Sequence, residues 1–396
     1  MAFSGDLLRN KNFVLLLGVQ TLSVLGDAFS TVAVPLLALH ATGSVAQMGV
    51  LTALTGVASV VTGTFAGGIV DRFDRRRVLV VCDVGRFLLY GLIPVLWWWS
   101  PVIWPLYVIV PLAAALGMVF NVAYVTVLPS IVDPGDITRA NGMLYGVFAV
   151  AGVAGPALAG VVSGVFGPAA AIGLDSVTFL VSAFGLRFIR LRPYAREETG
   201  GRLAGARFLL GNPVLRTMTI LLTALIFLTA GLDDLVVFHL KENLEQPDAV
   251  VGYVLGAGAI GTIIGSMVVA RVRRRLGFGP TWLASTTLAG LAVIAVALSG
   301  GVVAGIGALM ALFSLAITVG AICSMSLRQE ITPAHLLGRV TAAFWTIHFA
   351  LGPLGATLAT WTAAGQGVAP VVTLMGAGLV LTAAGGLFSP LRRSGL

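Results

Sequence analysis

The chain has 396 residues, of which 58% are hydrophobic and only 10% are charged, and its mean hydropathy is +0.99. Soluble chains carry charge on roughly a quarter of their residues, so this composition excludes a soluble globular core and indicates a polytopic membrane protein. The net charge of +8 does not indicate nucleic-acid binding, because the basic residues are spread over many short loops.

Twelve apolar stretches are long enough to cross a bilayer, which takes about 20 helical residues. The first is longer than a signal-peptide core and is expected to remain as a helix. We predict an all-α membrane protein with spans at residues 13–39, 45–70, 77–98, 102–128, 140–165, 169–189, 214–238, 249–270, 280–299, 302–327, 337–363 and 368–390.

Basic residues indicate on which side of the membrane each loop lies. Apart from Arg86, inside a span, and Lys241, all of the 24 Lys and Arg residues fall at the termini or in every second loop. Because basic short loops stay in the cytoplasm, both termini and the loop near residue 200 are predicted to be cytoplasmic. Arg far outnumbers Lys, and Gly and Ala are abundant, which favours the plasma (inner) membrane of a bacterium.

The chain matches itself at an offset of about 199 residues. Asp71-Arg72 and Arg75-Arg76 align with Ala270-Arg271 and Arg274-Arg275. Each half holds six predicted spans, so the halves keep one orientation, and rocking between them would expose a midplane site to each side in turn. We therefore predict two pseudo-symmetric six-helix bundles at 1–189 and 214–396, joined by a cytoplasmic linker at 190–213.

Span one carries Asp27 near its middle, with no Lys or Arg in the same predicted span. A charge at a helix centre costs about 2.5 to 3.5 kcal/mol on insertion scales, so such groups face a cavity or a partner. Burial favours the neutral acid. We expect Asp27 to be unpaired and interpret it as a proton-coupling or substrate-contact residue; a purely structural hydrogen bond is the alternative.

The loop after span two resembles the GxxxDRxGRR signature of the major facilitator superfamily, with Asp74 where the family usually has Gly. The resemblance implies a cytoplasmic gate that latches the two halves, with its acid near a helix N-terminus, where the helix dipole favours a negative charge. A solvated basic loop is the alternative. The residues that carry the match are Gly67, Asp71, Arg72, Arg75 and Arg76.

Spans three and four add two observations. Asp83 and Arg86 lie three residues apart on span three and are interpreted as a structural ion pair. Span four has no charge from residue 102 to 128, where many proton-coupled exporters of the superfamily carry an Arg. Coupling would then depend on other residues.

Span five is similar to the antiporter motif of drug-exporting members, with Ala at two positions that usually hold Gly. Small residues let helices approach closely, and Pro bends a helix. With Gly26-Asp27 and Arg139-Ala140-Asn141, the match extends along the chain and resembles the macrolide-efflux and enterobactin-exporter branch. The motif residues are Gly142, Gly155, Pro156 and Gly160.

Four more ionisable residues lie inside later spans. Asp175 of span six is expected to pack at a helix interface. Asp233 and Asp234 of span seven point in different directions, so that one faces a cavity and the other the outer surface, unless both lie at a water-exposed helix end. His348 of span eleven is either a proton-transfer group or a buried neutral imidazole.

Several signals are discounted. The run 256–261 fits GxGxxG, but it lies inside span eight and follows no strand, so it predicts close helix contact rather than nucleotide binding. Cys82 and Cys323 lie within spans, which argues against a disulfide or a metal site. We predict no cofactor, no metal, no nucleic-acid partner and no enzymatic activity.

The sequence thus predicts a monomeric secondary transporter in the lipid bilayer. It would export a small amphipathic compound, such as an antibiotic, a siderophore or another metabolite, in exchange for protons by alternating access. A flippase for lysophospholipids or other lipids and an importer of the same superfamily are the alternatives. A membrane-embedded enzyme is the remotest one, because the sequence has no catalytic constellation.

Overall fold

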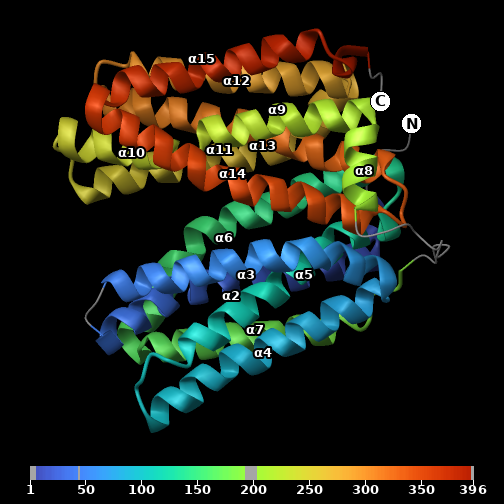
Figure 1. Ribbon diagram of the computed structural model, residues 1–396, viewed down its shortest axis with the longest axis vertical. Helices are drawn as coiled ribbons and strands as arrows, with labels where there is room; N and C mark the ends of the chain where they lie inside the picture. Colours follow the sequence, from blue (N-terminus) through green and yellow to red (C-terminus); the bar gives the residue numbers. More distant parts are fainter. Residues whose placement is uncertain (1–5, 43–44, 192–202, 394–396) are drawn as a thin grey trace. The chain divides into compact units, whose positions relative to one another are not determined.

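The computed structural model describes residues 6–42, 45–191 and 203–393, and all regular structure in these ranges is helical (Figure 1). It contains 12 candidate spans that are long and apolar enough to cross a membrane. The predicted all-α fold with twelve spans is therefore confirmed, and the chain is a multi-pass membrane protein.

The first half of the chain forms six of these spans. Its elements are α1 (Asp6–Arg9), α2 (Lys11–Thr42), α3 (Val45–Arg72), α4 (Arg75–Trp99), α5 (Leu106–Ile131), the 3-10 turn η1 (Pro134–Asp136), α6 (Ile137–Phe166) and α7 (Pro168–Leu186).

The second half forms the other six. Its elements are α8 (Ala204–Gly211), α9 (Pro213–Thr229), α10 (Leu232–Phe238), the π-helical turn η2 (His239–Asn243), α11 (Asp248–Leu276), α12 (Phe278–Ala297), α13 (Val303–Ile331), α14 (Leu337–Gln366), α15 (Val368–Leu387) and the 3-10 turn η3 (Pro390–Arg393).

The chain divides into two compact units whose borders differ from the predicted sequence halves. Unit 1 comprises Met1–Ala140, Val150–Ala206 and Thr332–Thr346, and unit 2 comprises Asn141–Ala149, Arg207–Ile331 and Ile347–Leu396. Helices α6 and α14 therefore each contribute a segment to both units. The two six-helix bundles at 1–189 and 214–396, with their linker at 190–213, were predicted from the sequence repeat, and this division stays a prediction.

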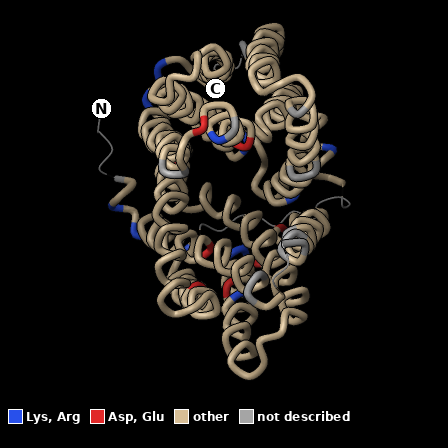
Figure 2. The backbone as a smooth tube through the Cα atoms, turned by 90° about the vertical axis from the view of Figure 1, so that its left-hand side faces the viewer, with Lys and Arg blue, Asp and Glu red and all other residues tan. Residues whose placement is uncertain are grey.

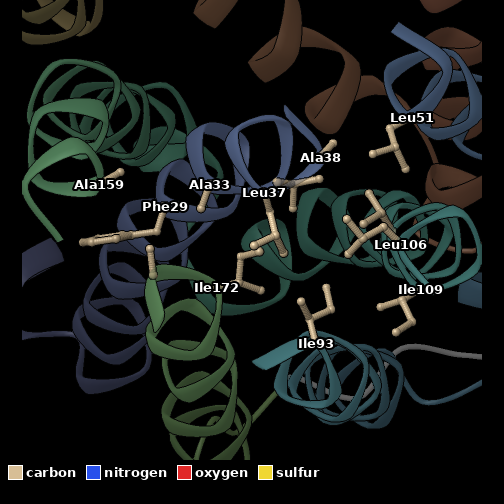
Figure 3. Close-up of a cluster of buried hydrophobic side chains, with 13 residues drawn as sticks. Phe29, Ala33, Leu37, Ala38, Leu51, Ile93, Leu106, Ile109, Ala159 and Ile172 are labelled. Carbon is tan, nitrogen blue, oxygen red and sulfur yellow. The ribbon is translucent and has the colours of Figure 1, made fainter. Parts of the chain in front are cut away.

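The core of unit 1 depends on small as well as large side chains. Figure 3 shows Leu37 of α2 facing Ile172 of α7, with Ile93 of α4 beside them. Ala33 and Ala159 in the same cluster are fully buried. Because lipid tails are as apolar as these side chains, helices in a membrane associate through close van der Waals packing, which small residues permit.

In unit 2, glycines bring α11 against α13. A Cβ atom added at Gly261 would lie 1.9 Å from the carbonyl oxygen of Ala311, and one at Gly265 would lie 2.7 Å from that of Leu315. The backbones therefore touch where the sequence has its GxGxxG run. The prediction of close helix contact holds at Gly261, whereas no described atom lies within 4 Å of the corresponding point at Gly256.

Span seven is interrupted, although we expected one uninterrupted helix. Helix α9 ends at Thr229 and α10 begins at Leu232, and between them Gly231 has φ 83°. Only Gly adopts this left-handed conformation at no steric cost. A Cβ atom at Gly231 would also lie 3.0 Å from the Cα atom of Ala356 on α14, so packing within unit 2 and backbone conformation both require glycine at the break.

Candidate functional site

Arg86 of α4 joins carboxylates from two helices inside unit 1. It donates to Asp83 on its own helix, as predicted, and its Nη1 atom also lies 3.4 Å from Oδ1 of Asp27 on α2. The prediction that Asp27 is unpaired is therefore wrong. Its partner comes from a neighbouring helix, and residue spacing along α2 carries no information about that contact.

Aromatic rings enclose the guanidinium group of Arg86. Its Cζ atom lies 4.6 Å from the ring centroid of Phe120 and 4.0 Å from that of Phe179. Cations are attracted to ring faces at these distances, most strongly when they are removed from water. The side chains of Arg86 and Asp83 are 6% and 0% exposed, whereas that of Asp27 is 48% exposed. The ion pair is thus buried at one end and open at the other.

Asp175 of α7 completes this group of charges, and it lies at a helix interface as predicted. It is fully buried and accepts hydrogen bonds from Ser30 of α2 and, at 3.3 Å, from Thr178. A Cβ atom at Gly26 would lie 2.1 Å from Oγ1 of Thr178. Glycine at position 26 therefore lets α7 approach α2 closely enough for these hydrogen bonds.

The buried cluster contains more acid than base. Arg86 forms ion pairs with Asp27 and Asp83, and the carboxyl group of Asp175 lies close enough to interact electrostatically with its guanidinium. Full ionisation of the three acids would leave an excess of two negative charges. Unpaired charge is costly in an apolar interior, so the cluster favours binding of protons. Figure 2 shows acidic and basic positions close together among the helices.

The predicted gate residue Asp71 contacts the first turn of α14 within unit 1. Its side chain is 2% exposed and accepts from the backbone N–H groups of Gly338 at 3.1 Å and Arg339 at 3.2 Å. A Cβ atom at Gly67 would lie 2.5 Å from the Cα atom of Arg339. The acid thus lies at a helix N-terminus, where the helix dipole stabilises a carboxylate.

Two of the arginines that follow Asp71 donate hydrogen bonds to backbone carbonyl groups. Arg75 is 2% exposed and donates to the carbonyl oxygen of Thr126 at 3.1 Å and to that of Ala334. Arg76 donates to the carbonyl oxygen of Arg187 at 3.3 Å. Both side chains therefore tie the loop to the ends of neighbouring segments of unit 1, while Arg72 is exposed.

Asp74 has a local role. Its side chain accepts from the backbone N–H of Arg77 at 2.9 Å and caps the N-terminus of α4. An N-cap side chain satisfies one of the helix's unpaired donors. This explains how the loop tolerates an acid where the family signature has glycine.

The small residues of span five differ in their surroundings. A Cβ atom at Gly142 would lie 2.5 Å from the carbonyl oxygen of Ser266 in unit 2, and one at Gly155 would lie 2.3 Å from Cβ of Ala28 in unit 1. No described atom lies within 4 Å of the corresponding point at Gly160, and Pro156 is exposed. The prediction of close packing thus holds at Gly142 and Gly155 and fails at Gly160, which points away from neighbouring helices.

The remaining candidates lie in unit 2. Asp233 and Asp234 occupy the first turn of α10, directly after the break in span seven, and both are exposed. His348 on α14 is 4% exposed. Among the described residues, no three His, Cys, Asp or Glu side chains are arranged to bind a metal ion.

Sequence reasoning missed two polar contacts in unit 2. Arg273 of α11 forms a two-pronged salt bridge with Glu330 of α13, at 2.9 and 2.5 Å. Asn141 of α6 donates to Gln329 at 2.6 Å and to Ser326 at 3.0 Å. The only signal was Glu330 itself, an acid that follows Arg328 directly after the predicted span 302–327.

Comparisons with known proteins give a consistent result. The model of the Major Facilitator Superfamily matches residues 16–357. The chain is 26% identical to the multidrug efflux pump Tap of Mycobacterium tuberculosis over 384 residues, which cover 89% of this chain and 88% of Tap. It is also 26% identical to the enterobactin exporter EntS of Escherichia coli over 354 residues, covering 86% of this chain and 82% of EntS.

Among solved structures, the fold is similar to a bacterial homologue of the iron transporter ferroportin in an outward-facing state. The TM-score is 0.81 at 18% identity, and the match covers 96% of this chain and 99% of the other. At this identity the likeness concerns the fold alone.

Proposed function

Because the chain belongs to the major facilitator superfamily, we propose that it exports a small amphipathic compound in exchange for protons. As a member of this superfamily, the chain is a transporter of small molecules and not an enzyme. The direction is inferred from the similar proteins, one named an efflux pump and the other an exporter. We propose a monomer that works by alternating access.

The observation that carries the proton coupling is the surplus of acid around Arg86. Asp27 is the half-exposed member of the cluster, whereas Asp83 is fully buried, and this difference favours Asp27 as the residue that exchanges the proton. When ionised, Asp27 pairs with Arg86. When protonated, Asp27 is neutral and no longer forms an ion pair with the guanidinium, which remains paired with Asp83. A single proton thereby changes the contact between α2 and α4.

Other residues have supporting roles in this proposal. Asp71 acts as the gate, because its contact with the first turn of α14 joins segments far apart in sequence. Asp233 and Asp234 contribute solvent-accessible carboxylates next to the break in span seven. Broken helices are common at the substrate and ion sites of transporters. Buried Asp175 and His348 are further candidates for proton coupling or substrate contact.

The test is Asp27→Asn in proteoliposomes that contain a trapped pH indicator. Ethidium serves as the multidrug probe and enterobactin as the siderophore. For the wild-type protein, a proton gradient should drive accumulation of one probe, and a protonophore should abolish it. Asp27→Asn should abolish gradient-driven transport while the protein stays folded, because Asn preserves the shape and removes the titratable group.

Asp136→Asn is the matched control, since Asp136 lies in the turn before α6 and makes no side-chain cap hydrogen bond. It should transport as the wild type does. Undiminished proton-driven transport by Asp27→Asn would remove Asp27 from the coupling mechanism. Movement of the probe across the membrane that resists the protonophore would favour a lipid flippase or a facilitator.

A further inference from the structure

An open groove of about 470 Å³ runs along unit 1 between α2 and α7, with α1 at one end. Pockets for small molecules have roughly 300 to 1,000 Å³, so its size suffices for a ligand. Its walls include Val14, Gly18 and Leu22 of α2 and Val181 of α7, and at one end lie Arg9 and Lys11.

The absence of a side chain at Gly18 leaves the space that forms the groove. No described atom lies within 4 Å of the point where its Cβ atom would be. The next residue, Val19, fills the space over Gly185 of α7, where an added Cβ atom would lie 2.4 Å from Cγ1 of Val19. The two helices thus pack closely at Val19, while the face that carries Gly18 is left open.

The groove has a polar end and an apolar strip. Val14, Gly18 and Leu22 follow each other at four-residue spacing, so they share one face of α2, and this strip lies within the candidate span Lys11–Ala38. Arg9 and Lys11 at the beginning of the strip are exposed. None of the described residues that line the groove is acidic.

We propose that this groove binds an anionic glycerophospholipid, independently of the transported compound. One acyl chain lies on the strip of Val14, Gly18 and Leu22, and the phosphate group contacts Arg9 and Lys11. The strip lies at membrane depth, which argues for a lipid rather than a soluble partner. Each basic residue near the membrane surface strengthens binding of anionic lipid about fivefold, so a negative headgroup matches the charge of the groove.

Native mass spectrometry of the purified chain in detergent tests the charge requirement. Phosphatidylglycerol and phosphatidylcholine with identical acyl chains are the two probes. The wild type should bind phosphatidylglycerol at least about tenfold more tightly, and Arg9→Gln with Lys11→Gln should weaken this binding about thirtyfold, from two basic residues. Arg271→Gln with Arg275→Gln removes the same charge from exposed positions on α11 and should bind as the wild type does.

Gly18→Leu tests the apolar strip, because it fills the groove and keeps both cations. It should reduce binding of phosphatidylglycerol at least about tenfold, the effect of losing about two buried CH2 groups of the acyl chain, whereas Gly385→Leu, another glycine with no atom within 4 Å, should not. Equal binding of both lipids, displacement of phosphatidylglycerol by inorganic phosphate, or wild-type binding by both groove variants would overturn the proposal. Unchanged melting temperatures in phosphatidylcholine confirm that the variants are folded.

Discussion

At the scale of single residues, Arg86 is the cation that compensates the buried carboxylates of unit 1. Its guanidinium contacts Asp83 and Asp27 and lies between two aromatic rings. Removing one partner of a buried ion pair typically costs about 3–5 kcal/mol, because the other charge is left uncompensated. Asp27 can escape this penalty by binding a proton, since its side chain is 48% exposed and is less tightly enclosed than that of Asp83.

A second residue-scale feature is Gly26, which lets α7 approach the cluster. We predict that Gly26→Ala destabilises the protein by about 1–3 kcal/mol through overpacking, because the added Cβ atom would lie 2.1 Å from Oγ1 of Thr178 and 2.5 Å from Oδ1 of Asp175. Thermal unfolding in detergent measures this cost. Gly18→Ala on the same helix is the control and should be neutral or slightly stabilising. Equal melting temperatures for the two variants would contradict the predicted close approach of α7.

At the scale of elements, α14 begins with a contact from a carboxylate of another helix. Asp71 on α3 accepts from two N–H groups in the first turn of α14. At the beginning of α6 the N-cap residue Asp136 makes no side-chain cap hydrogen bond, and the repeat places Ala270 where the first half has Asp71. The two copies of the repeat are therefore chemically unequal at this helix end.

This inequality leads to a prediction about the beginning of α14. Asp71→Ala should lower the free energy of local opening there by about 0.5–2 kcal/mol, the usual cost of losing a helix cap. Hydrogen exchange of the amides of Gly338 and Arg339 should accelerate accordingly. Asp136→Ala should leave exchange at the beginning of α6 unchanged. If exchange in α14 does not respond to Asp71→Ala, the carboxylate does not hold this helix end in solution.

At the scale of the whole molecule, orientation in the membrane follows from loop charge. Because the positive-inside rule counts Lys and Arg in short loops, we predict that the loop after Lys241 is outside the cytoplasm and the loop at Gly277 is inside. Alkaline phosphatase fused after Leu244 should be active, and the same fusion after Gly277 should be inactive. Green fluorescent protein at these sites should give the opposite pattern. The reverse result at both sites would invert the predicted topology.

Much of the fold was accessible from sequence because its determinants are local. A helix satisfies its own backbone hydrogen bonds, and no other open structure can do so in lipid, so apolar length alone predicted the twelve spans. The run from Gly67 to Arg76 was recognisable by its resemblance to a family signature because its residues are contiguous, and that resemblance implied a carboxylate near a helix N-terminus. Asp83 and Arg86 were recognisable as a pair because they are three apart on one helix.

The contacts between helices were decided only by the tertiary structure. Sequence could not reveal that Arg86 reaches Asp27, that Gly160 points away from its neighbours or that span seven breaks at Gly231, because each depends on how helices are rotated and staggered against one another. In lipid, hydrophobicity does not favour one apolar face over another. The close approaches at Gly26, Gly155 and Gly261 set these rotations, and only the packed molecule identifies which of its many glycines make such contacts.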